Sequence, residues 1–372
     1  MNRSNTKELQ LLEKASSEFS KHVLAPEREE SDKYPFGPYF NHIIDKAYKL
    51  DFFHITLPEH IGGIGHGIRA FCLVLEQICR EDSSLGGIIF TNAMAQEIIM
   101  ASGQHDMLKN HSDNAMNPRQ FLLAFPSLLN PSENPKLPLA RRMGDNYTLS
   151  GPIDYLVLGG ITQMAVIPAV IAGDMGCSFF LTNLSNSGVS VGEHVMSHGL
   201  HACPAADVIL TDAKGILLGE EGKGMDYFNK AAGIMQLAAS AMALGIMRGS
   251  LKEAMTYCGG RVQGGRKLKD WSAMQMLLAD MAIQTHVANM LVQRACQAIE
   301  NQEKDWSSCV QAASIHILSA ATHLTSDGIQ SLGGVGYMKD FGQEKRFRDA
   351  GQIQAMLGHG HLKKIRFIKQ FI

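Results

Sequence analysis

The feature that most constrains this chain is a double change in its hydrophobic pattern. Through residues 1–118, apolar residues recur at helical spacing, as in FCLVLEQI at 71–78. Residues 119–222 instead hold short β-rich runs, among them MAVIPAVIA and SFFLTNL, separated by Gly, Pro, Asn and Asp clusters. Helical spacing returns over 223–372. The pattern predicts a mostly α protein with an N-terminal helical domain, a small antiparallel β domain in the middle and a C-terminal helical bundle.

The last zone is predicted to hold long helices that form the bundle. The predicted segments are about 226–258, 270–302, 307–330 and 350–370. The second of these segments carries an apolar stripe at the spacing that is typical of bundle helices.

Composition excludes several classes of function. The net charge of -2 gives no electrostatic basis for binding nucleic acid or an anionic membrane surface. Seven cysteines without a CxxC motif argue against a disulfide framework or a zinc site and predict a reducing, cytoplasmic environment. The sequence shows no apolar run of about 18 residues, so no membrane span is expected.

Four motifs lie in order along nearly the whole chain. They are LPEHIGGIG at 57–65, LLGEEGKGMDYF at 217–228, YCGGRVQGGRKLKDWSAMQMLLADMA at 257–282 and DGIQSLGGVGYMKDFGQEKRFRDA at 327–350. A GGVG run alone is typical of a helix end and turn. Together, however, the four motifs resemble those of the acyl-CoA dehydrogenase family.

This resemblance implies an architecture and a chemistry. It implies an N-terminal helical domain, a middle β-barrel or sandwich domain, a C-terminal four-helix bundle and tetrameric assembly. It also implies FAD, an acyl-CoA substrate and electron transfer to an electron-transfer flavoprotein. A carboxylate base removes the α-proton of the thioester while hydride passes from the β-carbon to flavin N5. A desolvated Glu suits this role because burial makes it a stronger base.

The chain departs from the family at the catalytic base. The family's Glu stands seven residues beyond an Arg-Asp-Ala motif, which is present here at 348–350, but the corresponding residue is Leu357. In other members the base lies early in the first long C-terminal helix, and that position falls at Met235, followed by Gln236 in place of Arg. Neither familiar position can take a proton.

A second departure affects the residues with which a subunit of the family holds its own FAD. The family has Thr-Glu-Pro and Trp-x-Thr stretches, and two polar side chains after the base. The corresponding residues here are Leu128, Leu129, Asn130, Tyr155, Val157, His359 and His361. The subunit's own FAD pocket is therefore expected to be largely lost.

The other half of a family FAD site comes from the neighbouring subunit. It supplies an Arg for the pyrophosphate, a Gln and a Gly-Gly turn, and here Arg261, Gln330, Gly333 and Gly334 match these positions. An Arg fork and open glycine amides suit a pyrophosphate. One residue differs, because Gly264 replaces the family's Phe.

Three other residues are interpreted as structural. Arg348 and Asp349 are expected to form an ion pair or a cap, because the family uses this stretch to lead into the base helix. Cys203, in HACPAAD, is expected to be a small buried hydrophobic residue rather than a reactive thiol.

Four residues are candidates to supply the base or metal chemistry that the familiar positions lack. His359 and His361 are two positions apart, so they do not share one helix face, and a metal site or a His base is disfavoured. Glu97 or Asp82 would be a displaced base in the N-terminal domain, although carboxylates are most often solvated surface residues.

Three functions remain open. The first is a subunit without a base that completes the FAD site of an active homologue in a hetero-oligomer, which the selective loss favours. The second is a free-standing FAD enzyme with a displaced base or a different flavin chemistry. The third is an acyl-CoA-binding or scaffold protein without catalysis.

Overall fold

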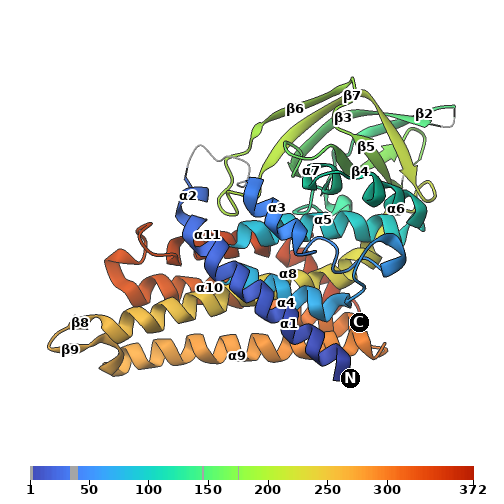
Figure 1. Ribbon diagram of the computed structural model, residues 1–372. Coiled ribbons are helices and arrows are strands. Elements are labelled where there is room, and N and C mark those ends of the chain that lie inside the picture. The colour runs from blue at the N-terminus through green and yellow to red at the C-terminus, as the bar shows by residue number, and fades with distance from the viewer. Residues whose placement is uncertain (1–2, 34–40, 145, 175) are drawn as a thin grey trace.

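The computed structural model describes residues 3–33, 41–144, 146–174 and 176–372 (Figure 1). The predicted order of helices, strands and helices is confirmed.

The N-terminal region contains short helices packed around one central helix. The helices are α1 (Arg3–Phe19), α2 (Ala25–Ser31), α3 (Asn41–Lys49), α4 (Gly67–Cys79), α5 (Ser83–Ala101), α6 (His105–Asn114) and α7 (Pro118–Phe121). A π-helical turn at Ser20–Leu24 lies between α1 and α2. Helix α5 packs against α8 and β1 and is buried on nearly every face. It begins where the side chain of Asp82 accepts a hydrogen bond from the backbone N–H of Ser84 at 2.8 Å.

The middle region is a small barrel with two additional strands. Its strands are β1 (Leu123–Ala124), β2 (Leu139–Met143), β3 (Asn146–Val157), β4 (Met164–Ile171), β5 (Cys177–Asn183), β6 (Val189–His194) and β7 (Ala205–Leu218). Strands β4, β2, β3, β7 and β5 pair in that order, and β5 pairs with β4 to close the ring. The expectation of a wholly antiparallel domain was wrong, because β1 and β2 both pair with β4 in parallel. Strand β3 lies between β2 and β4 in the sequence and pairs with β2 in antiparallel fashion. Closure of the ring then places β2 beside β4, where the two strands run parallel.

The C-terminal region is a bundle whose long helices cross the lower half of Figure 1. Its helices are α8 (Gly224–Gly260), α9 (Ser272–Glu300), α10 (Trp306–Leu332), α11 (Gln343–Gln354) and α12 (Gly360–Ile368). A hairpin of β8 (Val262–Gln263) and β9 (Arg266–Lys267) joins α8 to α9.

The single helix that was predicted over 350–370 is two helices. The chain breaks between them, where Leu357 has φ +60° and Gly358 has φ +105°. Left-handed backbone of this kind cannot continue an α-helix. The break lies at the position that the resemblance aligns with the family's catalytic Glu.

Helix α8 is long and apolar enough to cross a membrane by length and composition alone. However, 78% of its most apolar window is buried inside the protein. This burial is what the core helix of a bundle requires.

A buried ionic cluster joins the three regions. Nζ of Lys345, on α11, lies 3.0 Å from the Asp82 carboxylate at the start of α5 and 2.7 Å from that of Asp349. The Asp349 carboxylate also accepts the backbone N–H of Leu200, in the loop before β7, at 2.8 Å. Burial alone would lower the pKa of Lys345, but the facing carboxylates raise it well above its usual range. The lysine is therefore charged and fully engaged.

Replacing Lys345 by Met should destabilise the fold strongly, because it leaves two buried carboxylates facing each other without a cation. We expect the free energy of unfolding, measured by urea denaturation, to fall by about 3–5 kcal/mol. Lys109→Met is the matched control, since Lys109 makes an exposed ion pair with Asp113. Equal denaturation midpoints for the two variants would contradict the role assigned to the cluster.

Candidate functional site

The loop between α11 and α12 is fixed against the segment after β1. The backbone N–H of Leu357 donates to the carbonyl oxygen of Ser127 at 2.9 Å, and the Leu357 side chain is buried. A Cβ atom on Gly358 would lie 2.8 Å from the carboxylate oxygens of Glu133, so only glycine fits there. Leu357, which the resemblance aligns with the family's base, is thus a buried aliphatic residue on a tightly held turn.

Glu133 strengthens this contact. It lies in a short 3-10 turn, Pro131–Glu133, and only 5% of its side chain is exposed. Its carboxylate accepts the backbone N–H of His359 at 2.9 Å and pairs with Arg366 of α12 at 2.6 Å. Two segments that the resemblance assigns to a subunit's own FAD are therefore bonded to each other.

A cavity of about 230 Å³ lies beside Leu357. It is lined by Asn130, Phe228, Asn229, Ala232, Gly233, Gln236, Ser307, Gln311, Ile315, Leu357, Lys363 and Arg366. None of these lining residues is a carboxylate. Burial lowers the pKa of Lys363 to about 8, and its Nζ donates to the carbonyl oxygen of Met356. Met235, the other base position, is completely buried.

The two residues at the family's Trp-x-Thr positions, Tyr155 and Val157, also make hydrogen bonds or strand pairings within this chain. Tyr155 has φ +56°, and its backbone N–H donates to the carboxylate of Asp207 at 2.8 Å. The Tyr155 hydroxyl accepts a hydrogen bond from the side-chain amide of Gln352 on α11. Val157 is buried and pairs with Ala205 in the β3–β7 ladder.

The residues that match the half of a family FAD site supplied to a neighbouring subunit, called here the lent half, lie at two helix ends. Arg261 follows the last turn of α8, and Gln330, Gly333 and Gly334 lie at the end of α10. Figure 1 shows α8 running into the β8–β9 hairpin. The thiol of Cys258 lies 3.6 Å from the carbonyl oxygen of Ser331 and joins the two helix ends.

These four residues are accessible. All four are exposed, and within the described part of the chain the guanidinium of Arg261 has no hydrogen-bond or ion-pair partner. Gly333 has φ +63°, and a Cβ atom on Gly333 would meet nothing within 4 Å. An unpaired fork beside an open glycine turn fits the demands of a pyrophosphate.

Gly264, which replaces the family's Phe, lies in the turn of the hairpin. A Cβ atom there would lie 2.9 Å from the ring of Trp271, so this ring fills the space beside the glycine. The guanidinium carbon of Arg266 lies 3.6 Å from the Trp271 ring centroid. An aromatic group is thus present at this end of the bundle, although it comes from another residue.

The two histidines and Cys203 lie in different surroundings. His359 and His361 are exposed, and no group of three or more His, Cys, Asp or Glu residues in the described ranges is placed to hold a metal. Cys203 is buried beside Gly87, and burial raises the pKa of its thiol well above the usual range. An inert thiol agrees with the prediction for Cys203.

The prediction of ion pairs for Arg348 and Asp349 is confirmed. Arg348 pairs with Asp32 at 2.6 Å and with Glu344 at 2.7 Å. Sequence reasoning missed Asp32 and His201, whose carboxylate and ring nitrogen lie 2.8 Å apart. Burial would raise the pKa of Asp32, but His201 and the neighbouring cations hold it well below its usual range. Asp32 and His201 are 169 positions apart in the sequence, so no local motif could have predicted their contact.

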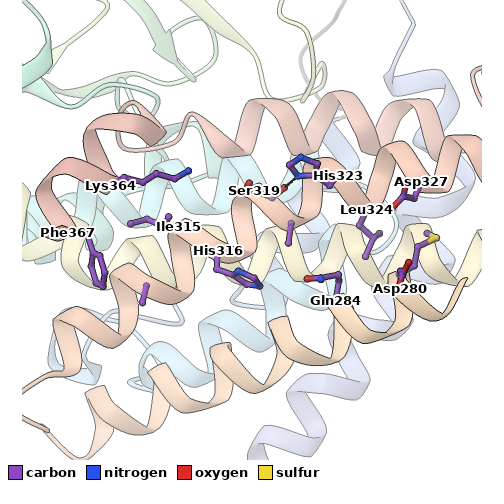
Figure 2. A pocket seen from close by; sticks show the side chains of 13 residues that line it. Asp280, Gln284, Ile315, His316, Ser319, His323, Leu324, Asp327, Lys364 and Phe367 are labelled. Atoms are coloured by element: carbon purple, nitrogen blue, oxygen red, sulfur yellow. Dashed lines mark hydrogen bonds between the residues drawn. The ribbon is translucent and has the colours of Figure 1, made fainter. Parts of the chain in front are cut away.

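A further cavity lies between three helices of the bundle. Figure 2 shows this space of about 700 Å³ between α9, α10 and α12, with Asp280 and Asp327 at one end and Lys364 and Phe367 at the other. Burial, and then the nearby Asp280, raise the pKa of Asp327. The cavity holds none of the predicted flavin contacts.

The two candidate displaced bases differ in their availability. Asp82 is committed to the start of α5 and to Lys345. Glu97, near the end of α5, is partly buried, and burial raises its pKa to about 7 despite Lys230 nearby. A carboxyl group with this pKa has the proton affinity of a general base at neutral pH. Glu97 lines none of the cavities described above.

Two family profiles match the chain. One is the acyl-CoA dehydrogenase N-terminal domain, over residues 6–111, and the other is the acyl-CoA dehydrogenase C-terminal domain, over residues 222–364. Among the similar proteins is the caffeyl-CoA reductase-Etf complex subunit CarC of Acetobacterium woodii, which is 27% identical over 94% of this chain and 95% of its own. The 3-(aryl)acrylate reductase of Clostridium sporogenes is 27% identical over 97% of each chain.

Solved structures agree in fold over the whole length. A chain in the structure of the electron transferring flavoprotein of Acidaminococcus fermentans is 26% identical, covers 100% of both chains and has a TM-score of 0.91. Butyryl-CoA dehydrogenase from Megasphaera elsdenii is 22% identical, covers 98% of this chain and 97% of its own, and has a TM-score of 0.88. The predicted fold class is confirmed.

Replacing Glu97 by Gln should remove a pH dependence of stability. Because the pKa of Glu97 is raised from 4.5 to about 7 by folding, its stabilising proton is fully present below pH 4.5 and is lost as pH rises through 7. Between pH 5 and 8 the wild-type protein should therefore lose about 1–3 kcal/mol more stability than Glu97→Gln in urea denaturation. Glu18→Gln, on an exposed helix face, is the control. Parallel stability curves for wild type and Glu97→Gln would show that Glu97 titrates normally.

Proposed function

The chain belongs to the acyl-CoA dehydrogenase family, and from this premise we propose that it is a subunit without a catalytic base in a hetero-oligomer. It acts in FAD-linked α,β-dehydrogenation of an acyl-CoA thioester by completing the FAD site of a homologous, active subunit. Members of the family bind FAD, and we propose that this FAD is shared between the two subunits. Electrons leave the complex through an electron-transfer flavoprotein.

The observation that carries this proposal is the contrast between the two halves of the site. On the chain's own side, Leu357 and Glu133 fasten the base loop to the 126–135 segment, and Tyr155 is bonded to α11. On the lent side, Arg261 and Gly333 face open space. Random loss of function would affect both halves, whereas selection for a lending role preserves only one.

Each lent residue has a defined task in this proposal. Arg261 offers a planar fork to the pyrophosphate of the partner's FAD, and the turn at Gly333 and Gly334 offers backbone N–H groups without a side chain in the way. Gln330 adds a neutral amide beside them. FAD, when bound, supplies the hydride acceptor, and the proton of the substrate is removed by the active subunit rather than by this chain.

Apolar side chains surround this end of the bundle. Met255 of α8, Val262 and Trp271 of the hairpin region, and Val335 and Tyr337 after α10 are all exposed. Exposed apolar groups around a polar centre are typical of a protein interface. They support the proposal that another subunit covers Arg261.

The relatives support the electron-transfer partner. One relative is named as a subunit of a caffeyl-CoA reductase-Etf complex, and a structural relative comes from work on an electron transferring flavoprotein. We propose a cytoplasmic location, because all seven cysteines carry free thiols and six of them are buried.

A second function is favoured by one observation, the raised pKa of Glu97. In this alternative the chain is a free-standing FAD enzyme, and Glu97 replaces the base that is missing at Leu357. The two proposals differ in whether the chain holds FAD by itself.

The absorption spectrum of the purified chain separates them. We expect colourless protein when it is expressed alone, and about one FAD per pair of chains when it is purified with an active homologue. Yellow protein alone, with about one FAD per chain, would establish the free-standing enzyme instead. Protein that stays colourless with the homologue and with added FAD would indicate a role without flavin.

In the complex, Arg261→Gln should weaken FAD binding by about 10- to 100-fold, because it removes a charge-assisted hydrogen bond. The measurement is fluorescence titration of the flavin-free complex with FAD. Arg141→Gln, on the exposed face of β2, should leave the affinity unchanged. An unchanged affinity in Arg261→Gln would remove Arg261 from the site.

A further inference from the structure

We propose that a cavity between α2, α4, α8 and α11 binds a phosphate monoester that carries an apolar or aromatic body. The cavity has a volume of about 440 Å³, which lies within the range of small-molecule sites. It contains none of the residues assigned to FAD, so it is separate from the proposed function.

The lining of this cavity carries a surplus of positive charge. Four cationic side chains line it against two carboxylates, and these six residues are Arg28, Arg80, Lys252, Arg346, Glu81 and Glu253. Glu81 lies between Arg28 at 3.8 Å and Lys252 at 3.7 Å, so its single charge is divided between two loose partners. Two cationic charges thus lack a carboxylate of their own in the cavity, and an anion is the ligand that would balance them.

Two of the arginines converge on one point. A Cβ atom on Gly342 would lie 2.6 Å from Nη1 of Arg346 and 2.8 Å from Cζ of Arg28. Both guanidinium groups therefore close on the same small space, where they repel each other. Burial lowers the pKa of Arg346, and Arg28 adds to this effect while Glu253 opposes it. An anion between the two guanidinium groups would relieve this repulsion.

Arg346 also has a donor without a partner among the described residues. Its Nη1 pairs with Glu253 at 2.6 Å and its Nη2 donates to the carbonyl oxygen of Arg80 at 3.3 Å. No described residue accepts a hydrogen bond from its buried Nε, although only 7% of the side chain is exposed. Gly249 lies beside this nitrogen, and a Cβ atom there would approach it to 2.7 Å. An unpaired buried N–H is unfavourable, and a ligand oxygen, directly or through a water, would satisfy it.

An aromatic wall faces these charges. Tyr257 of α8 and Phe341, just before α11, line the same cavity with ring centroids 5.5 Å apart in an edge-to-face arrangement. Arginine forks suit the planar, bidentate recognition of phosphate oxygens, and aromatic rings suit an apolar group. The ligand class follows from this combination.

The test is isothermal titration of the full chain with phenyl phosphate, inorganic phosphate and phenol. We expect saturable binding of phenyl phosphate, weaker binding of inorganic phosphate and no binding of phenol. Arg28→Gln should weaken phenyl phosphate binding by about ten-fold or more, since one charge-assisted contact is lost. Arg69→Gln is the matched control, because Arg69 is similarly buried and also paired, with Glu300, but lies outside the cavity.

A second variant separates the contribution of the arginines from that of the aromatic side chains. Phe341→Ala should reduce the affinity for phenyl phosphate to that for inorganic phosphate. Equal binding of the two ligands by the wild-type protein would overturn the apolar part of the proposal. Absence of saturable binding would overturn the whole, and so would equal affinity in Arg28→Gln and Arg69→Gln. Arg28→Lys keeps the charge without the fork and provides a second variant if Arg28→Gln unfolds, as judged by its thermal transition.

Discussion

The charge of Lys345 is the interaction on which the rest of the structure depends. Through Asp82 it holds the start of α5, and through Asp349 it holds the loop before β7, so the N-terminal helices, the barrel and the bundle meet at one ammonium group. Charges inside a protein are tolerated only when their partners are placed accurately. Next to this cluster, Arg348 is likewise placed between two carboxylates, those of Asp32 and Glu344. The cluster therefore fixes the position of α11, from which the turn at Leu357 emerges.

The proposed half-site role depends on what a rigid framework allows. The fold is shared with the acyl-CoA dehydrogenase family, and in our proposal this chain closes one half of the flavin site with internal hydrogen bonds and leaves the other half open. Closure needs only neutral or compensated contacts, such as the backbone bond from Leu357 to Ser127. Openness needs glycine, because Gly333 has a left-handed backbone and empty space where a side chain would begin. Stability and accessibility are thus assigned to different ends of the same bundle.

Much of the fold could be predicted from the sequence, because the spacing of apolar residues changes from helical to strand-like and back to helical along the chain. The predicted segment 270–302 corresponds to α9, whose apolar stripe faces the bundle. Helix α5 lies within the predicted helical zone 1–118, but its own bounds were not predicted, because it is buried on nearly every face and so shows no helical periodicity. The parallel pairing of β2 with β4 and the contact of Asp32 with His201 depend on chain closure over long distances, which local patterns do not report. The sequence showed an aliphatic residue, Leu357, where the resemblance places the family's base, but it did not show the hydrogen bond that holds Leu357 to Ser127.

The length of α8 has a geometric consequence for any assembly. One part of this helix reaches the cavity beside Leu357 through Gln236, and its end carries Arg261. At a rise of about 1.5 Å per residue, these two positions are about 37 Å apart along the helix. A continuous helix of this length keeps that separation fixed, so under the proposed function the two half-sites of one chain would contact different cofactor molecules. In a pair related by an approximate two-fold axis, each half-site faces the complementary half of the other chain. If only one of the two chains supplies a catalytic base, such a pair would hold one active site. The expected ratio is then one active site for every two chains.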